Sequence, residues 1–174
     1  MRAAIERVIS TADFSAFGAL VRAYVFSLPF ELNFQDIDRE LAELPHEYGP
    51  PLGAAMLARV DGEAVGCVGI RALEPPKVAE MKRMYLRPDA RGEGSGRALA
   101  EAAIEVAAAQ GYEVVRLDTV AEMGEAGALY RSLGFVEIAP YRHNPLPTAR
   151  FYEMALGPPS GSPRPPPNQP RRPS

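Results

Sequence analysis

The sequence feature that most constrains the fold is a short glycine-rich segment over residues 91–97, which reads Arg-Gly-Glu-Gly-Ser-Gly-Arg. It lies between an apolar run and an alanine-rich stretch of helical periodicity, and therefore predicts a strand, a tight turn and a helix in succession. Glycines at alternate positions allow the backbone to approach a ligand that a Cβ atom would keep away. The first N–H groups of a helix lack partners within it and carry the positive end of its dipole. We therefore predict an anion site here, and a pyrophosphate is the anion that fits it.

Two common nucleotide-binding motifs do not match this segment. Glycines 92, 94 and 96 have the spacing Gly-x-Gly-x-Gly, whereas the Rossmann fingerprint requires Gly-x-Gly-x-x-Gly. No Lys-Ser or Lys-Thr follows the last glycine, which excludes the phosphate loop of nucleotide hydrolases. For this segment taken alone, a plain flexible turn is the alternative interpretation.

Composition excludes several other classes of protein. The single cysteine, Cys67, excludes an internal disulfide framework and is expected to be core packing. Cys and His pairs at zinc-finger spacing are missing, so we expect no metal. The N-terminus lacks the pattern of a signal peptide, and no apolar run is long enough to span a bilayer. We therefore expect a cytoplasmic protein with no membrane partner.

The last 18 residues differ from the rest of the chain. Residues 157–174 hold 8 of the 18 prolines, three arginines and no acidic residue. With almost nothing apolar to bury, they predict a disordered tail, or alternatively a polyproline ligand, after a single domain over residues 1–156. Without the tail the chain has 16 basic and 22 acidic residues, a net charge of about −6. Nucleic acid is therefore not an expected partner, because such binders are normally basic.

Hydrophobic periodicity and turn signals predict an α/β fold of the α+β type, with a mixed sheet flanked by helices. The predicted order is β-α-α-β-β-β-α-β-α-β-β. We predict strands over 5–9, 54–60, 63–71, 78–86, 113–119, 135–138 and 151–156, and helices over 11–26, 36–44, 96–110 and 123–133. The Asp61-Gly62 pair predicts a hairpin between the second and third strands. The glycine turn follows the strand over 78–86, and ligands favour such strand ends.

That same strand carries three charged residues at its centre, Glu80, Lys82 and Arg83. Charged groups in a covered strand are costly unless they are paired or used, so they indicate a functional site. Glu80 and Lys82 are two residues apart and share one face of the strand. An ion pair between them is therefore one alternative, and it would make Glu80 a poorer base.

Two motifs together resemble the GNAT superfamily of acyl-CoA-dependent N-acyltransferases. The first, [Gln/Arg]-x-x-Gly-x-[Gly/Ala], is matched by Arg91, Gly94 and Gly96 between the predicted strand and helix. The second, Leu-Tyr-x-x-x-Gly-Phe, is matched at residues 129–135. The predicted element order also resembles that of the family, and the resemblance covers about residues 4–156. It implies a twisted, mostly antiparallel sheet of about seven strands flanked by about four helices.

The resemblance also implies acetyl-CoA as the co-substrate. In the family, backbone N–H groups of the glycine turn hold its pyrophosphate, here Arg91, Gly92, Glu93, Gly94, Ser95, Gly96 and Arg97. The sheet splays after the preceding strand, whose free backbone groups pair with the pantetheine arm, here Met84, Tyr85 and Leu86. The acceptor is expected to be the amine of a small molecule or a peptide. The sequence leaves the oligomeric state open, a homodimer included.

Glu80 is the candidate general base. Several family members place a catalytic glutamate at its spacing from Arg91. An alkyl amine with a pKa of about 10.4 is almost wholly protonated at neutral pH, so the acceptor must lose a proton. Binding of the acceptor and a purely structural role are the alternatives for Glu80.

Tyr130 is the candidate general acid, because the family motif places a phenol beside the leaving thiolate. The alternative is a core tyrosine on the apolar face that also holds Ala126. One departure concerns Met123, where many family members have an asparagine that contacts the cofactor. Gly124 and Gly127 each weaken the helix by about 1 kcal/mol relative to alanine.

Two segments are candidates for the acceptor side. Residues 31–47 contain six acidic residues with aromatic residues interleaved or adjacent, among them Phe26, Phe34 and Tyr48. An exposed wall of this kind would favour a cationic amine, while a solvated helix face over core aromatics is the alternative. The segment over residues 141–145 presents the same choice, between a loop that closes over the acceptor and an ordinary one.

The function that we predict is transfer of an acetyl group from acetyl-CoA to an amine, by direct attack in a ternary complex. The alternative is a non-catalytic acyl-CoA-binding or regulatory module that has kept the cofactor cleft. A dinucleotide enzyme is a third hypothesis, and it would require stabilisation by NAD or FAD.

Overall fold

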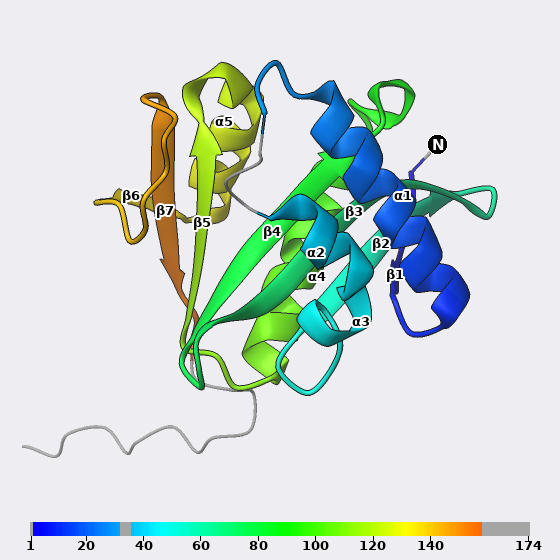
Figure 1. The fold of residues 1–174 in the computed structure, drawn as a ribbon, viewed down its shortest axis with the longest axis horizontal. Coiled ribbons are helices and arrows are strands. Elements are labelled where there is room, and N and C mark those ends of the chain that lie inside the picture. The colour runs from blue at the N-terminus through cyan, green and yellow to red at the C-terminus, as the bar shows by residue number, and fades with distance from the viewer. Residues whose placement is uncertain (1, 32–35, 158–174) are drawn as a thin grey trace, which may run out of the picture.

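The computed structural model describes residues 2–31 and 36–157, and its strands form one seven-stranded sheet in the order β1-β2-β3-β4-β5-β7-β6 (Figure 1). The strands are β1 (Ala4–Arg7), β2 (Ala54–Val60), β3 (Glu63–Glu74), β4 (Val78–Leu86), β5 (Val114–Val120), β6 (Val136–Ile138) and β7 (Ala149–Ala155). Neighbouring strands pair antiparallel except β4 and β5, which are parallel. The predicted mixed, mostly antiparallel sheet is confirmed. The predicted disordered tail lies outside the described residues, apart from Gly157.

Over the described residues, five α-helices accompany the sheet, one more than predicted. They are α1 (Thr11–Ser27), α2 (Ile37–Ala42), α3 (Leu44–Glu47), α4 (Ser95–Ala109) and α5 (Gly124–Leu133). The prediction of one helix over 36–44, ended by Pro45, is wrong. Pro45 lies in the first turn of α3, where the N–H that proline lacks would have no partner in the helix. A capping box between Ser10 and Asp13 explains why α1 begins at Thr11.

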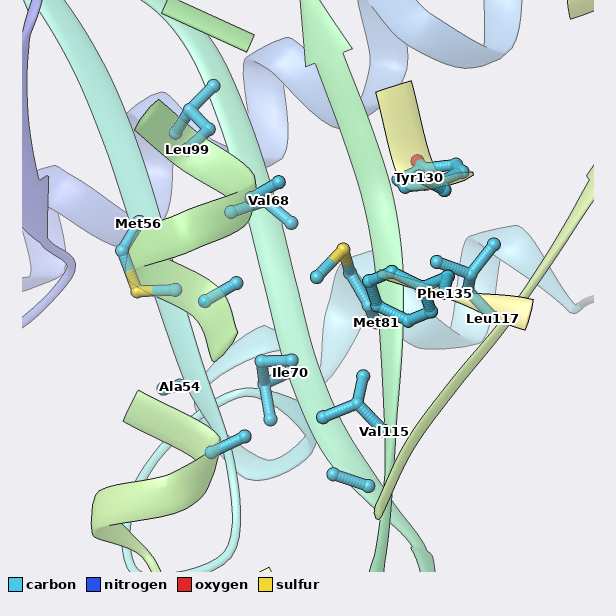
Figure 2. Close-up of a cluster of buried hydrophobic side chains, with 14 of the residues drawn as sticks. Ala54, Met56, Val68, Ile70, Met81, Leu99, Val115, Leu117, Tyr130 and Phe135 are labelled. Carbon is cyan, nitrogen blue, oxygen red and sulfur yellow. The ribbon is translucent and has the colours of Figure 1, made fainter. Parts of the chain in front are cut away.

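The helices divide between the two faces of the sheet. Figure 1 shows α1, α2 and α3 on one face, and α4 on the other. On the α4 face, a core cluster joins the helix to the sheet through side chains such as Leu99, Val68 and Ile70 (Figure 2). On the α1 face, Phe17 and Tyr48 pack in a second cluster that includes the fully buried Cys67. The prediction that Cys67 is core packing is confirmed.

A bulge in β4 changes which face its side chains occupy. Ala79 and Met81 belong to the α4-side cluster, and the alternation of a strand places Glu80 and Lys82 on the opposite face. Arg83 then has a φ of +58°, and the pairing of β4 with β3 shifts register at this point. Arg83 bonds to Glu40 of α2, so it points to the same face as Lys82. Two neighbouring cations therefore emerge on the α1–α3 face of the sheet.

β4 and β5 pair only over a short stretch. Their ladder joins Val78–Glu80 to Val114–Arg116, and within the described residues no pairing between the two strands follows it. Figure 1 shows them side by side at one end and diverging toward α5. β5 keeps its other neighbour, β7, along its whole length. The sheet is therefore open between β4 and β5, on the side from which β4 leads to the glycine turn.

Candidate active site

The opening between β4 and β5 holds a cavity of about 70 Å³. Side chains from five elements line it, among them Tyr24 of α1, Lys82 of β4, Asp118 of β5, Met123 before α5, and Tyr130 of α5. The cavity therefore combines two phenols, an amine, a carboxylate, the guanidinium of Arg83 and the hydroxyl of Thr119 with several apolar side chains. This composition is typical of a site where protons are moved away from bulk water.

Tyr130 is both a core tyrosine and a residue of the cavity, the two positions between which the sequence left the choice open. Its side chain is buried, and its ring packs edge-on against Phe135 at 5.7 Å between centroids, next to Leu117 in Figure 2. It nevertheless lines the cavity. Burial above all, and then the neighbouring Tyr24 and Asp118, raise the pKa of Tyr130 well above its usual value. The phenol therefore stays protonated, as a hydrogen-bond donor in the opening.

The two glycines of α5 do not displace Tyr130 from the opening. Gly127 is buried, and a Cβ atom there would lie 3.4 Å from the hydroxyl of Tyr152, so this glycine lets α5 lie close to β7. Met123 is the residue immediately before α5 and contributes to the wall of the cavity. The apolar thioether of Met123 thus occupies the position where the resemblance to the family led us to expect a polar asparagine.

The sequence singled out Lys82 only as one of three charged residues that indicate a functional site and as a possible partner of Glu80, without a role in the reaction. Its side chain is 4% exposed, and Nζ lies 3.9 Å from Oε1 of Glu80. Burial first, and then the charges of Arg83 and Arg71, lower the pKa of Lys82 to about 7. The bulge that places Arg83 beside Lys82 could not be predicted from the strand pattern.

Glu80 is fully buried and surrounded by donors. Nε of Arg71 donates to Oε1 at 3.1 Å, and the hydroxyl of Tyr141 donates to Oε2 at 2.8 Å. Arg142 forms an ion pair with Oε2, and Lys82 is the fourth neighbour. Partners of this kind stabilise the charged carboxylate, which weakens it as a base. Of the three roles left open for Glu80, this geometry favours the structural one.

The segment over residues 141–145 packs against the same face of the sheet. The ring of Tyr141 contacts the guanidinium groups of Arg116 and Arg142, at 5.7 and 5.2 Å from its centroid. Nδ2 of Asn144 donates to Oδ2 of Asp118 at 3.1 Å. The structure thus brings this loop to Glu80 and to a residue that lines the cavity. Its position agrees with a loop that borders the acceptor.

The acidic segment divides between the interior and the surface. Glu40 is buried and accepts two hydrogen bonds from Arg83, at 2.8 and 2.6 Å, and a third from Tyr48. Neither alternative for this segment, an acidic wall of the acceptor site or a solvated helix face, therefore describes Glu40, because this carboxylate compensates a buried guanidinium. Asp36 and Asp38 are exposed, as is the side chain of Phe26. Phe34 lies outside the described residues.

The glycine turn has the backbone conformation that its residues predict. Gly92 and Gly94 have φ angles of +88° and +79°, in the left-handed region that favours glycine. A Cβ atom at either position would meet no atom within 4 Å, so the turn is open. Gly94 is the N-cap of α4 and provides no side-chain cap, so the first N–H groups of the helix face this opening.

The side chains of the turn are mostly engaged within the protein. Nε of Arg91 donates to the carbonyl of Leu86 at 3.0 Å, and Arg97 donates to Glu101 and Ser132. Ser95 is buried and Glu93 is exposed. Gly96, in the first turn of α4, faces Leu129 of α5. Main-chain N–H groups are therefore the donors that the turn presents to an anion.

The predicted pantetheine strand borders the opening. Met84 lines the cavity, while Tyr85 packs on Tyr24 at 5.9 Å between ring centroids. In the described residues of β4 beyond Glu80, the strand has no ladder partner on the β5 side. Residues 84–86 therefore lie between the cavity and the glycine turn, where a linear group could connect the two.

Two further properties concern the described part of the chain alone. Over residues 2–31 and 36–157, no group of three or more His, Cys, Asp or Glu side chains is placed to hold a metal ion. Over the same residues, no helix has the length and apolar character that crossing a membrane requires.

Comparison with known proteins supports the interpretation of this opening. The model of the acetyltransferase (GNAT) family matches residues 19–135. An uncharacterized N-acetyltransferase of Schizosaccharomyces pombe is 37% identical over 153 residues, which are 87% of this chain and 94% of that protein. N-acetylaspartate synthetase of Rattus norvegicus is 32% identical over 133 residues, 75% of this chain and 44% of that protein.

A solved structure shows the same fold. It is that of a Salmonella typhimurium protein described as a putative acetyltransferase with its cofactor acetyl-CoA. It superposes with a TM-score of 0.70 at 20% identity, over 90% of this chain and 95% of that one. The family match, the similar sequences and the shared fold agree with the two motifs and with the divergence of β4 and β5. The chain therefore belongs to the acetyltransferase (GNAT) family and is an acyltransferase.

Proposed function

We propose that this chain transfers the acetyl group of acetyl-CoA to an amine acceptor by direct attack in a ternary complex. The observation that carries the proposal is the divergence of β4 and β5, with Tyr130 in the opening and the glycine turn at the end of β4. An extended molecule with an anionic group at one end and a reactive group at the other would fit this arrangement. Acetyl-CoA has that form, and it is the cofactor of the Salmonella structure of the same fold.

The turn and the strand supply main-chain contacts. N–H groups of the glycine turn and of the first turn of α4 would hold the pyrophosphate, since hydrogen bonds to a charged group are worth about 1.5–3 kcal/mol each. Residues Met84–Leu86 would pair with the pantetheine arm as an added strand. Backbone donors are already ordered, so little entropy is lost when they bind.

The chemistry would take place in the cavity. The acceptor nitrogen attacks the thioester carbonyl, whose oxygen is polarised by a backbone N–H near Met84. Tyr130 donates a proton to the departing thiolate. Its raised pKa makes complete transfer more uphill than for an ordinary phenol, but it also guarantees a protonated donor at the moment the thiolate forms.

For the acceptor we propose a small amine or a peptide amine. The face that it would approach carries charges of both signs, including Lys82, Arg142 and Asp118. Free aspartate belongs in the first set of amines to be tested, because one similar protein is named N-acetylaspartate synthetase.

The experiment is release of the coenzyme A thiol with a panel of amines, with each product identified by mass spectrometry. The panel comprises aspartate and other amino acids, polyamines and short peptides with free N-termini. Amine-dependent release with a matching acetylated product supports the proposal. If acetyl-CoA raises the melting temperature and no amine in a broad panel is acetylated, the non-catalytic acyl-CoA-binding module is the better description.

Gly94→Ala tests the anion site. The added Cβ atom is strained at a φ of +79° and points into the space where a pyrophosphate would lie, so we expect acetyl-CoA to bind at least about 10-fold more weakly, equal to about 1.4 kcal/mol. Gly62→Ala is the matched control, because Gly62 has a φ of +82° and open surroundings in the hairpin between β2 and β3. Both variants should lose similar thermal stability, and calorimetry should find weakened binding in Gly94→Ala alone. Equal affinities in the two variants would contradict the pyrophosphate site.

A further inference from the structure

The chain uses lysine at only two positions. Of its 19 basic residues, Lys77 and Lys82 are the lysines and the others are arginines. Lys77 has a side chain that is 67% exposed, whereas that of Lys82 is 4% exposed and lines the cavity. Arginine stays protonated in proteins, while a buried lysine can lose its proton. The one buried lysine of the chain therefore lines the cavity that also holds Tyr130.

The groups around Lys82 come from each element that packs near it. They are Glu80 and Arg83 of β4, Arg71 of β3, Asp118 of β5, Tyr24 of α1, Glu40 of α2 and Tyr130 of α5. Burial and the two guanidinium groups favour the neutral amine, while Asp118 and Glu40, together with the Glu80 carboxylate 3.9 Å from Nζ, favour the ammonium. The bidentate bond to Glu40 fixes the guanidinium of Arg83, so this cation cannot turn away from Lys82. The balance brings the pKa of Lys82 to about 7.

Glu80 and Lys82 differ in their access to the cavity. Glu80 has no exposed surface, and both of its carboxylate oxygens already have donors. Lys82 borders the cavity together with Tyr130. We propose that Lys82 is the general base that accepts a proton from the acceptor ammonium, and that Glu80 is a positioning residue that holds Arg71 and the loop over 141–145. This inference depends on the proposed acetyltransferase function.

The proton balance of the step is closed. The acceptor ammonium gives one proton to neutral Lys82, and the free amine attacks the thioester carbonyl. The nitrogen–carbon bond forms, the carbon–sulfur bond breaks, and Tyr130 gives its proton to the departing thiolate. The second proton of the nitrogen then passes to the phenolate of Tyr130, which restores the phenol. Lys82 returns its proton to solvent. The net change is an ammonium and a thioester converted to an amide, a thiol and one proton.

The kinetic test compares Lys82→Arg and Lys82→Met with Lys77→Met, using the amine that the panel identifies. For the wild type we expect kcat to rise with pH through an apparent pKa near 7 and then to level off, because only the neutral amine accepts a proton. Both Lys82 variants should lose about 10²-fold or more in kcat. Their remaining rate should follow the neutral fraction of the acceptor and rise to about pH 10. Lys77→Met should behave as the wild type, and acetyl-CoA affinity and the circular dichroism spectrum show whether each variant is folded.

Two variants test whether Lys82 acts through its basic nitrogen rather than through its positive charge, and whether Glu80 acts only by positioning its partners. Lys82→Arg keeps the positive charge and removes the basic nitrogen, so full activity in this variant would overturn the proposal. Glu80→Gln should lower kcat through misplacement of its partners, and the rise of kcat with pH should persist, moved to lower pH by the loss of a carboxylate 3.9 Å from Nζ of Lys82. If this rise is lost in Glu80→Gln and kept in Lys82→Met, Glu80 is the base.

A spectroscopic test does not depend on an acceptor. With ¹³C-labelled lysine the protein should give two Cε signals, and the one that Lys82→Arg removes should titrate near neutral pH. A signal of Lys82 that stays in the ammonium form up to pH 9 would overturn the inference and leave acetyl transfer untouched. If no amine is acetylated and the signal titrates near neutrality, the proposed function fails, and the proposal that Lys82 is its base fails with it. The titration would then still show that the Lys82 side chain loses its proton near neutral pH. Acetylation of Lys82 by acetyl-CoA alone would also overturn the inference, because the group would be a nucleophile.

Discussion

Replacing Tyr130 with phenylalanine is expected to lower kcat by about 10²-fold or more and to leave acetyl-CoA affinity nearly unchanged. General acids contribute about 10²–10⁴-fold to the steps that they assist. The ring of Tyr130 packs on Phe135, so the variant keeps the apolar contacts and loses only the hydroxyl at the cavity. The measurement is single-turnover and steady-state release of coenzyme A with a reactive acceptor, together with calorimetry of acetyl-CoA binding.

Tyr152→Phe is the matched control for this variant. Tyr152 is also buried, its ring lies 6.3 Å from that of Tyr130, and its hydroxyl accepts a hydrogen bond from Arg131 at 3.0 Å. It is not among the residues that line the cavity. The control should change stability and leave kcat within a few-fold of the wild type. Full turnover in Tyr130→Phe would show that the thiolate takes its proton from elsewhere.

The raised pKa of Tyr130 adds a condition on the pH profile. A general acid is lost when pH rises above its pKa, and burial moves this point for Tyr130 above that of an ordinary phenol. We therefore expect no decline of kcat between pH 8 and about pH 10, the range in which an exposed tyrosine would begin to ionise. A basic limb in that range, absent from Tyr130→Phe, would contradict a buried and protonated phenol.

Local sequence signals predicted the parts of the site that depend on the backbone. The Asp61-Gly62 hairpin and the glycine turn lie where the residues place them, since a left-handed φ is a property of the glycines themselves. The strand before the turn has the predicted bounds, Val78–Leu86. Motifs of this kind can be found because their physical cause lies within a few residues.

Side-chain partners from distant segments could not be predicted in the same way. Glu80 is held by Arg71 and by Tyr141, which lie 9 and 61 residues away along the chain. Arg83, at the bulge, bonds to Glu40, 43 residues away, and an arginine with a φ of +58° has no signal in the strand pattern. Because the bulge places Arg83 beside Lys82, the environment of this lysine became visible only in the folded chain.

The buried ion pair between Glu40 and Arg83 is expected to contribute strongly to the stability of the fold. Glu40→Gln should lower the free energy of unfolding by about 3–5 kcal/mol, because it leaves the guanidinium buried without a counter-charge. The side chains of Arg83 and Glu40 are 2% and 4% exposed, so solvent can compensate little. Glu43→Gln is the matched control, since its carboxylate is 45% exposed and lies 3.9 Å from the exposed Arg39. Urea unfolding at pH 7 should show a loss near zero for the control.

The stabilisation by Glu40 is expected to depend on pH, because its contact with Arg83 requires the charged carboxylate. Burial alone would raise the pKa of Glu40, but hydrogen bonds and charge from Arg83 outweigh it and lower the value. A lowered pKa in the folded state means that the stabilisation is complete above the unfolded pKa, about 4.3, and is lost as pH falls through the folded one. The difference between wild type and Glu40→Gln should therefore be full at pH 7 and shrink below about pH 4. A constant difference over this range would show that the loss comes from packing.

A double replacement separates the effect of the Glu40–Arg83 ion pair on stability from its effect on the pKa of Lys82. Glu40→Leu with Arg83→Met removes both charges, and we expect it to recover most of the stability lost in Glu40→Gln, because apolar pairs often replace buried ion pairs without loss. The same change removes Arg83, the first charge that lowers the pKa of Lys82, and also Glu40, which raises that pKa by less. In the labelled-lysine experiment, the Lys82 signal of the double variant should titrate at higher pH than in the wild type. An unchanged Lys82 titration in a stable double variant would contradict this expectation, and would show that the ion pair of Arg83 and Glu40 has no net effect on the pKa of Lys82.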